Sequence, residues 1–419
     1  MEKMHSVDLI MIGCGPSNLA VSVALEEKNK VGNIKTSIIL EKDNTVCWHR
    51  GMLFPEAQSQ VSFLKDLVTQ RDPTSRFSFL NFLHKTQRLD QFINLQTFNP
   101  FRKEISNYLQ WVADNLKKTE VVYGFKVIDI TPEIDRNGKI SEWRVISEKG
   151  EEYRAKKIIY GGGRDLNIPE VFTGLSEERV IHSVNYLSFL NHIDKGNIRN
   201  IAVIGGAQSS AEIYQSCLDQ FPEAKISMIM RSIGLVNYEG SQFTNTLFQN
   251  EYINTHFEKN DEIKANVLKA MRTTNYAGVA PATLSGLYRF HYLQDMNGKK
   301  RAFMHTQCEI LEADEHQDGV VIKWKDNIND KICSEKFDLV FLGTGFKNKT
   351  PILFENLQKA LKLEKIKVSR KYRAELPYAE GASLHLQGVN EETHGIADSL
   401  LSVLALRSRE IVDDLLVKQ

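Results

Sequence analysis

The chain has 419 residues, of which 42% are hydrophobic and 25% are charged, a composition typical of a folded globular protein with two or three domains. Lysine plus arginine and aspartate plus glutamate number 53 each, so the balanced charge argues against nucleic-acid or membrane-surface partners. No uncharged run is apolar enough to cross a membrane, and the five cysteines are scattered without a C-x-x-C pair, which indicates a reduced, cytoplasmic protein.

The first predicted elements form a mononucleotide-binding unit. An apolar run at residues 7–12 predicts a strand, and no export signal fits before it. A glycine turn, a helix to about residue 27 and a second strand at 36–40 follow, and this strand ends at Glu41. Such a unit binds a pyrophosphate at the turn and the helix N-terminus, and an adenosine ribose at the acid. The third glycine of the usual fingerprint is replaced by asparagine. The predicted ligands in the turn are Gly13, Gly15, Pro16, Ser17 and Asn18.

The next stretch predicts an amphipathic helix at about 104–117 and a small antiparallel meander between 126 and 161. Three phenylalanines at positions 77, 79 and 82 are interpreted as core, because the chain lacks the basic excess of a base-stacking protein.

A second nucleotide-binding unit is predicted near residue 205. A strand at 201–204, a turn at 205–210, a helix to about 220 and a strand at 226–230 follow in order, ending at Arg231. Ala207 stands where a second glycine usually lets the backbone approach phosphate. A guanidinium at the end of the second strand suits the 2′-phosphate of NADP. Two dinucleotide sites in one chain indicate a flavin-and-nicotinamide oxidoreductase.

Residues 239–295 are polar, aromatic and helical in pattern, and a strand at 338–342 then leads into a further glycine turn. The last 25 residues predict one helix after the turn at 393–395. The histidines form no metal-binding motif and no G-x-S-x-G elbow occurs, so we expect neither a metal site nor a serine hydrolase. His291 and Asp295 are interpreted as a surface pair.

Several sequence blocks together resemble the flavin-dependent N-hydroxylating monooxygenases, the ornithine and lysine hydroxylases of hydroxamate siderophore biosynthesis. The F-L-K-D-L block and the N-Y block are the most specific, and the matches run in the family's order from about residue 7 to 409. The matching blocks lie at 48–49, 58–68, 72–75, 77–81, 206–212, 243–245, 274–276 and 393–402.

The resemblance implies a reaction. NADPH reduces FAD, reduced flavin and O2 form a C4a-hydroperoxyflavin, and a neutral primary amine attacks its distal oxygen. It also implies an α/β fold of two Rossmann-like domains with an inserted, mainly helical substrate segment. The FAD domain would comprise 1–165 and 348–419, the NADPH domain 166–238 and 295–347, and the substrate segment 239–294. A homotetramer is a further family expectation.

The resemblance assigns site residues by position. The implied catalytic residues are Gln60, Lys65 and Asn275. Besides the first turn and Glu41, the implied cofactor ligands are Trp48, His49, Gln60, Gly205, Gln208, Ser209, Ser210, Arg231, Asn275 and Leu400. The implied substrate ligands are Lys65, Asn245, Asn275 and Ala397.

Departures from the family pattern leave the substrate open. Residues 343–346 read G-T-G-F where A-T-G-Y is usual, and Ala397 replaces the serine of many ornithine hydroxylases. The N-Y block favours L-ornithine over lysine, whereas the lost hydroxyl leaves a decarboxylated amine (putrescine, cadaverine or histamine) as the alternative. A disulfide reductase, a flavin monooxygenase of ketones or thioethers, and a non-catalytic flavin-fold protein are remote alternatives.

Overall fold

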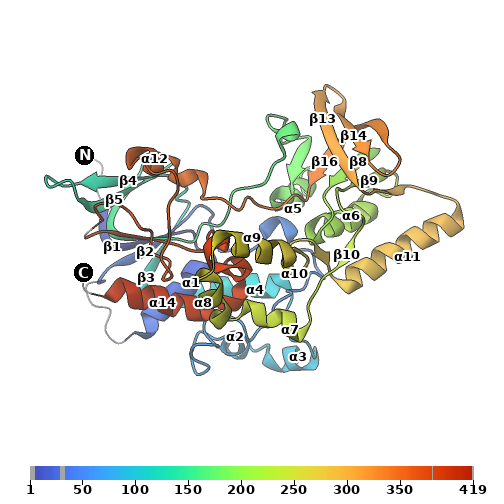
Figure 1. The fold of residues 1–419 in the computed structure, drawn as a ribbon. Coiled ribbons are helices and arrows are strands. Elements are labelled where there is room, and N and C mark those ends of the chain that lie inside the picture. Colours follow the sequence, from blue (N-terminus) through green and yellow to red (C-terminus); the bar gives the residue numbers. More distant parts are fainter. Residues whose placement is uncertain (1–4, 29–33, 380, 418–419) are drawn as a thin grey trace.

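The computed structural model describes residues 5–28, 34–379 and 381–417, which form two sheet-based lobes (Figure 1). The predicted α/β fold with two Rossmann-like units is confirmed. In the first sheet the strand order is β3-β2-β1-β6-β5-β4, and β17 also pairs with β6. Neighbours from β3 to β6 and the β6–β17 pair are parallel, whereas β4, β5 and β6 form the predicted antiparallel meander. The strands are β1 (His5–Ile12), β2 (Ser37–Glu41), β3 (Thr119–Tyr123), β4 (Val127–Ile134), β5 (Ile140–Ser147), β6 (Glu152–Tyr160) and β17 (Ser383–Leu386).

Helices from both ends of the chain cover this sheet. Helix α1 packs against α14 and α4, so the last described helix lies beside the first (Figure 1). The three phenylalanines predicted as core are 1–3% exposed, which confirms that prediction. The helices of this lobe are α1 (Pro16–Glu27), α2 (Phe79–Lys85), α3 (Leu89–Asn94), α4 (Arg102–Asn115), α12 (Glu355–Ala360), α13 (Glu391–His394) and α14 (Leu404–Leu416).

The predicted single helix over the last 25 residues is wrong. Two short 3-10 turns, η6 (Ile396–Ser399) and η7 (Leu401–Val403), precede α14. The interruption has a polar cause, because the Asp398 carboxylate is buried and accepts the Asn390 backbone N–H at 2.7 Å and the Arg407 guanidinium at 3.0 Å. Leu400 is extended (φ −105°, ψ 157°) and separates the two turns.

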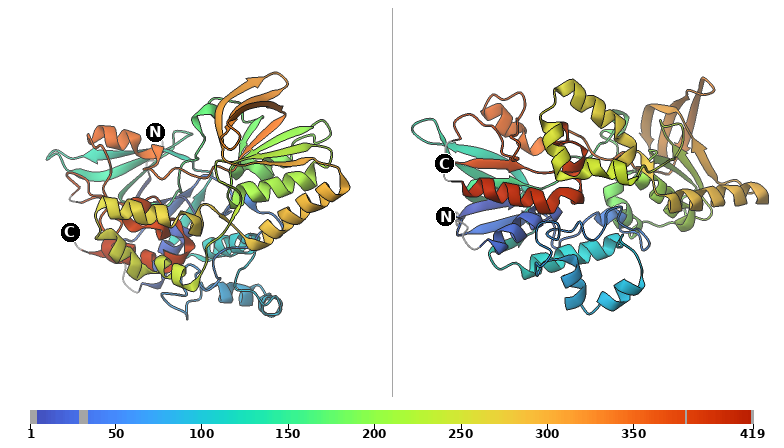
Figure 2. Two further views of the ribbon diagram at one scale, coloured as in Figure 1. Left: turned by 45° about the vertical axis from the view of Figure 1, so that its right-hand side comes forward. Right: turned by 60° about the horizontal axis from the view of Figure 1, so that its bottom comes forward.

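The second lobe is built on a parallel sheet of order β12-β9-β8-β16-β7. A three-stranded antiparallel sheet, β13-β14-β15, packs on one side and projects from the lobe (Figure 2). Its strands and helices are β7 (Val180–His182), β8 (Asn200–Ile204), β9 (Lys225–Ile229), β12 (Ala302–His305), β13 (Cys308–His316), β14 (Gly319–Asp326), β15 (Lys331–Phe337), β16 (Leu339–Leu342), α5 (Tyr186–Leu190), α6 (Gln208–Gln220) and α11 (Pro281–Asn297).

Helix α11 crosses the predicted boundary at residue 294 and packs on α6 through buried Leu287. The predicted surface pair of His291 and Asp295 does not form. The His291 Nε2 atom lies 3.1 Å from the Tyr214 hydroxyl, and Asp295 pairs with Lys300 instead at 3.0 Å. Its partly buried place between α11 and α6 lowers the pKa of His291.

A helical segment leaves the second lobe and packs on the first. Strands β10 (Val236–Asn237) and β11 (Gly278–Val279) pair in parallel at its base. Its helices lie near α14 in Figure 1, and two of them, α8 and α9, contact α13. They are α7 (Gln242–Asn245), α8 (Asn250–Phe257), α9 (Asp261–Ala270) and α10 (Arg272–Asn275).

The two lobes meet along a tight seam. In the first lobe the 3-10 turn η1 (Arg50–Met52) packs on η3 (Ser183–Asn185) and α5. A Cβ at Gly51 would lie 2.1 Å from the Val184 carbonyl oxygen, so only glycine fits there. Met52 is 5% exposed and belongs to the core of the second lobe.

An ion pair crosses the same seam. Both terminal nitrogens of Arg102, at the start of α4, lie 2.8 Å from the two carboxylate oxygens of Glu212 on α6. The pair is only 14% and 12% exposed, and the guanidinium also donates to the Met52 carbonyl oxygen at 3.2 Å. Forked pairing of this kind fixes orientation as well as distance.

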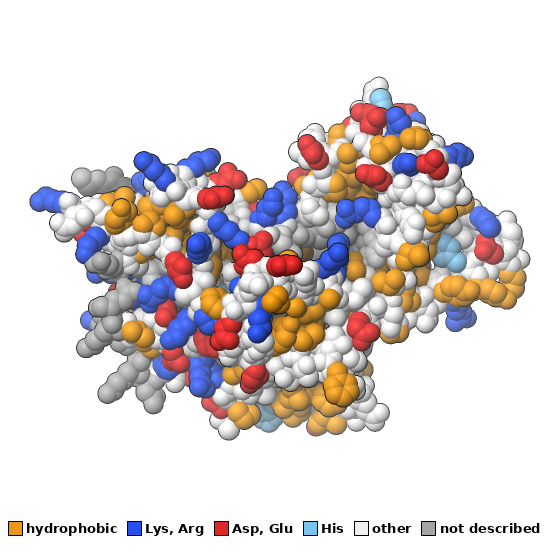
Figure 3. Space-filling view, viewed as in Figure 1, with side chains coloured by type: hydrophobic (Ala, Val, Ile, Leu, Met, Phe, Trp, Pro, Cys, Tyr) orange, Lys and Arg blue, Asp and Glu red, His pale blue; other side chains and the backbone are white. Residues whose placement is uncertain are grey.

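Charged side chains of both signs are spread over the face in Figure 3, which is hollowed at the top between the lobes. Within the described part of the chain, no helix is long and apolar enough to span a membrane.

We expect Arg102→Ala and Glu212→Ala each to lower the free energy of unfolding by about 1–3 kcal/mol, because each leaves a half-enclosed charge without its partner. In urea unfolding the double variant should lose less than the sum of the singles, by about 1–2 kcal/mol. Lys359→Ala, which breaks an exposed 3.9 Å pair with Glu355, is the control. Its effect should stay below about 0.5 kcal/mol. Additive losses would show that the two charges do not act together.

Candidate functional site

The turn between β1 and α1 is shaped by a close backbone contact. Gly13 has φ +87°, and a Cβ there would lie 2.8 Å from the Gly162 Cα atom. At Gly15 the nearest atom to an added Cβ would be the Gly161 carbonyl oxygen, at 3.7 Å. Protein contacts therefore require glycine at the first position, whereas the second leaves room beside a helix N-terminus. The space at Gly15 and the backbone N–H groups at the start of α1 fit a pyrophosphate.

Asn18 supports this turn from below. Its side chain is fully buried, and its amide nitrogen donates to the carbonyl oxygens of Ile12 (2.8 Å) and Gly13 (2.9 Å). Its amide oxygen accepts the side-chain amide of Gln387 at 3.0 Å. Of the predicted turn ligands, Asn18 can thus offer a cofactor only its backbone, whereas Pro16 and Ser17 are partly exposed in the first turn of α1.

Glu41 lies at the end of β2, beside the same turn. Its carboxylate accepts the backbone N–H groups of Cys14 at 2.6 Å and Asp43 at 3.0 Å. An anchored carboxylate beside a pyrophosphate-binding turn is the arrangement that holds an adenosine ribose. The residues of the first lobe therefore fit FAD.

The turn between β8 and α6 repeats the arrangement with less space. Gly205 has φ +128°, and a Cβ there would lie 2.6 Å from the Gly343 carbonyl oxygen. The Ser210 hydroxyl is buried; it accepts the Ala207 N–H at 3.4 Å and donates to the Gly343 carbonyl oxygen at 3.3 Å. Ser209 is partly exposed in the first turn of α6.

Gln208 joins this turn to neighbouring elements. Its side-chain oxygen accepts the Ala280 N–H at 2.7 Å, and its nitrogen donates to Glu212 at 2.8 Å. The side chain is therefore committed to protein partners, including the carboxylate that pairs with Arg102. Arg231 follows β9, is exposed and forms no ion pair with the described residues. The second lobe thus fits NADPH, with Arg231 free for a phosphate.

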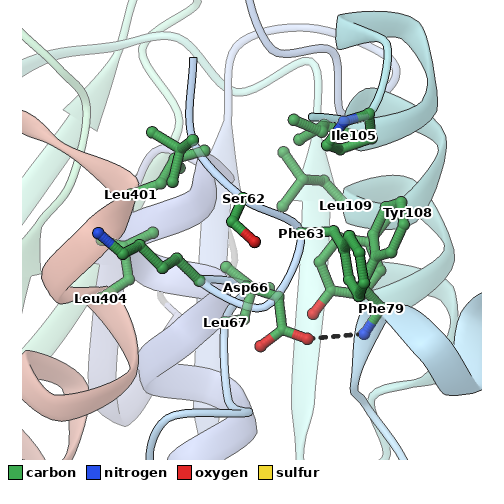
Figure 4. Close-up of a pocket in the computed structure, with 13 residues that line it drawn as sticks. Ser62, Phe63, Asp66, Leu67, Phe79, Ile105, Tyr108, Leu109, Leu401 and Leu404 are labelled. Carbon is green, nitrogen blue, oxygen red and sulfur yellow. Dashed lines mark hydrogen bonds between the residues drawn. The ribbon is translucent and has the colours of Figure 1, made fainter. Parts of the chain in front are cut away.

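A partly enclosed pocket opens beside the 61–67 loop, with Ser62, Phe63, Tyr108 and Leu401 pointing toward its interior (Figure 4). Its walls come from this loop, from α4 and from the chain around η7, so it lies close to the turn that carries Ala397 and Leu400. The lining residues are Val61, Ser62, Phe63, Lys65, Asp66, Leu67, Phe79, Pro100, Ile105, Tyr108, Leu109, Leu401 and Leu404.

Lys65 is the single cation that lines this pocket. It is half-buried, and burial lowers its pKa. It forms no ion pair with any described carboxylate. Its neighbour Asp66 is no partner, because that carboxylate accepts the N–H groups of Val68 (2.9 Å), Thr69 (2.6 Å) and Phe79 (2.7 Å), the last drawn in Figure 4. Lys65 is thus a cation that lacks an anion.

The remaining flavin-side candidates lie on nearby loops. The Gln60 side chain is exposed and has no hydrogen-bond partner among the described residues. Trp48 packs on the core of the first lobe, and its ring centroid lies 4.2 Å from that of His49. His49 is exposed and has a left-handed backbone (φ 55°) just before η1 at the seam.

The substrate candidates lie where the helical segment meets the C-terminal turn. Asn245 ends α7, is partly exposed, and its amide donates weakly to the Gly240 carbonyl oxygen at 3.4 Å. Asn275 ends α10, and its side chain lies outside the described part of the structure. Ala397 is 2% exposed, and Leu400 packs beside it. The apolar cluster around Ala397 comprises Phe248, Ile253, Met271, Ile396 and Val403.

A partly buried polar network lies at the same junction. The Tyr276 hydroxyl donates to Glu391, lies 2.9 Å from the Ser399 hydroxyl, and receives an Arg164 N–H at 3.3 Å. Asn348 joins Arg164 at 2.7 Å and Glu391 at 3.1 Å. Burial raises the pKa of Glu391 and raises the pKa of Tyr276 to about 12. The network ties the helical segment to the C-terminal turn and to both connections between the lobes.

The sequence analysis missed several residues that shape the site and lie far from it along the chain. Glycines at 161–163 follow a predicted strand, and this visible signal marks the backbone that Gly13 approaches. Arg407 lies among the buried residues of α14, and a lone arginine on an apolar helix face was the available signal. No local pattern marks Gln387 or the pairing of Arg102 with Glu212.

Comparisons with known proteins agree with this geometry. A family model described as L-lysine 6-monooxygenase/L-ornithine 5-monooxygenase matches residues 5–348. The chain is 32% identical over 413 residues to the L-ornithine N(5)-monooxygenase of Pseudomonas aeruginosa, covering 96% of this chain and 92% of that one. It is 33% identical over 406 residues to the L-ornithine N(5)-monooxygenase of Burkholderia cepacia, covering 94% and 91%.

The likeness extends to three dimensions. The structure of the ornithine N-hydroxylase of Kutzneria sp. 744 with reduced FAD, NADP+ and L-ornithine matches with a TM-score of 0.89 at 32% identity, over 98% of this chain and 99% of that one. The chain is a flavin-dependent monooxygenase and belongs to the L-lysine 6-monooxygenase/L-ornithine 5-monooxygenase family.

Proposed function

We propose that this chain N-hydroxylates the side-chain amine of L-ornithine for hydroxamate siderophore biosynthesis. The overall reaction consumes the amine, O2, NADPH and a proton, and yields the hydroxylamine, NADP+ and water. Bound FAD supplies the activated oxygen. The residues of the protein would hold the two dinucleotides and present the amine in its neutral form.

The two lobes divide these tasks. FAD is assigned to the first lobe (1–165 and 348–419) and NADPH to the second (166–238 and 295–347). The segment 239–294 closes over the site, with Asn245 and Asn275 as amine ligands. The seam at Gly51 and the Arg102–Glu212 pair support this assignment, because they hold the two turns at a fixed mutual orientation.

The unpaired Lys65 is the observation that supports L-ornithine as the substrate. A half-buried ammonium without a counter-ion is unfavourable, and a substrate carboxylate would supply the missing charge. The same cation repels a diamine that enters with its second amine protonated. An α-amino acid with a terminal amine satisfies Lys65 at one end and presents its amine at the other.

The reacting amine must lose its proton, because a free alkyl amine has a pKa of about 10.4. Apolar walls disfavour the charged form, and the pocket is lined mainly by hydrophobic side chains. Asparagine amides orient an amine by hydrogen bonds without adding a charge that would hold its proton.

One observation favours a second substrate class, the decarboxylated amines. Ala397 lies in an apolar cluster, where the serine of many ornithine hydroxylases would add a polar contact. Putrescine, cadaverine or histamine would need no such contact.

The deciding experiment is hydroxylamine formation from L-ornithine, L-lysine, putrescine, cadaverine and histamine with FAD, NADPH and O2. We expect L-ornithine to give the highest kcat/KM, because it carries a carboxylate for Lys65 and because the N-Y block at residues 274–276 favours it over L-lysine. Product from a decarboxylated amine alone would transfer the function to the second class, and product from none would reject both.

Replacing Lys65 should separate carboxylate binding from the rest of catalysis. We expect Lys65→Gln to raise the KM for L-ornithine at least about tenfold, the loss of one charge-assisted contact. NADPH oxidation without amine should change less than about twofold. Lys103→Gln on the exposed face of α4 removes the same charge and is the control. Equal KM effects in both variants would contradict a local role for Lys65.

The lowered pKa of Lys65 predicts a pH signature. Its ammonium is lost at a lower pH than that of a solvated lysine, so the KM for L-ornithine relative to putrescine should rise as the pH increases. Lys65→Arg keeps its charge, and the same ratio should rise less in that variant. Identical pH profiles of the ratio in both proteins would exclude Lys65 as the carboxylate ligand.

A further inference from the structure

A buried arginine reaches the FAD-binding turn from the C-terminal helix. The Arg407 side chain is 1% exposed, and its Nη2 atom lies 2.9 Å from the Ser17 hydroxyl. Its Nη1 atom donates to the Asp398 carboxylate at 3.0 Å and to the Asp398 carbonyl oxygen. Ser17 is the second residue of α1 and is partly exposed, so the serine faces the cofactor space while the arginine lies behind it.

The chemistry of this contact fixes the role of the hydroxyl. A guanidinium has only donors, so the Ser17 oxygen accepts and its own proton is left to be donated elsewhere. The helix N-terminus at the same place favours an anion. A pyrophosphate oxygen would therefore meet a hydroxyl proton that is both aimed and polarised by the charge behind it.

Arg407 binds more than the Asp398 carboxylate, because it also contacts the Asp398 carbonyl oxygen and the Ser17 hydroxyl. The Asp398 carboxylate also accepts the Asn390 backbone N–H at 2.7 Å, and the Arg407 Nε–H has no acceptor among the described residues. Another partly enclosed pair on α14, Arg373 with Asp414 at 2.7 Å, contacts buried His385 instead. Among the described residues, no hydrogen bond or ion pair joins Arg373 or Asp414 to the β1–α1 turn, so this pair serves as a comparison away from the turn.

We propose that Arg407 is a positioning residue for the FAD pyrophosphate, which it serves through the Ser17 hydroxyl. The proposal rests on the assignment of FAD to the first lobe. It adds a residue from α14 to a site whose other predicted ligands lie in the first sixty residues and near residue 400.

The test is FAD affinity, measured by titrating the apoprotein and following flavin fluorescence. We expect Ser17→Ala and Arg407→Lys each to raise the Kd for FAD about tenfold, since lysine cannot hold Asp398 and Ser17 together. The Kd for FAD of the double variant should be at most about twofold above that of the weaker-binding single variant, because both changes remove the same Arg407–Ser17 contact. Arg373→Lys is the matched control and should leave the Kd within about twofold.

Two results would overturn the proposal: folded Arg407→Lys protein that binds FAD as the parent does, or losses in the two single variants that multiply. If Arg407→Lys does not fold, Ser17→Ala decides alone, because it removes only the hydroxyl that Arg407 contacts. A Kd for FAD within about twofold of the parent in Ser17→Ala would then reject the role of Arg407. A protein that passes these tests but hydroxylates no amine would disprove the proposed function and leave this inference standing.

Discussion

The buried ion pair between Arg407 and Asp398 is the interaction on which the arrangement of the site depends. It holds α14 against α1 through Ser17, and it interrupts the C-terminal helix so that the turn with Ala397 and Leu400 can form. Removing one partner of such a pair costs about 3–5 kcal/mol, whereas an apolar replacement of both costs little. Since an apolar pair would serve stability as well, the charges are better explained by what they position: the β1–α1 turn and the turn with Ala397 and Leu400, to which we assign the cofactor and the substrate.

Contacts between segments remote in sequence assemble the rest of the site. Asn18 and Gln387 join the first turn to the strand that closes the first sheet, and the Tyr276–Glu391 network joins the helical segment to the connections between the lobes. Along the seam, an exclusively glycine position and a forked ion pair limit rotation between the lobes. The proposed reaction between two cofactors on different lobes would require this rigidity, because the reacting groups must stay within contact distance.

The sequence allowed prediction of whatever a local pattern encodes. Both nucleotide units, the meander and the aromatic core were predictable, because strand, glycine turn and helix are set by neighbouring residues. The interruption before α14 was not, because it follows from Asp398 binding Asn390 and Arg407, and hydrophobic periodicity does not record such contacts. The interpretation of Lys65 as unpaired was equally out of reach, since its neighbour Asp66 looks like a partner until the loop hydrogen bonds are seen. The fold could thus be predicted from hydrophobic periodicity, whereas the pairing of individual charged groups could not.

The choice between ornithine and a decarboxylated amine depends on which of two opposing features is larger. The missing hydroxyl at Ala397 removes one neutral hydrogen bond, worth about 0.5–1.5 kcal/mol. A substrate carboxylate that accepts from the half-buried Lys65 ammonium would form a charge-assisted hydrogen bond, worth about 1.5–3 kcal/mol. A diamine does not need the missing hydroxyl, but the Lys65 ammonium would repel its protonated second amine. The proposed contact with Lys65 therefore outweighs the loss at Ala397, which supports our proposal that the substrate carries a carboxylate.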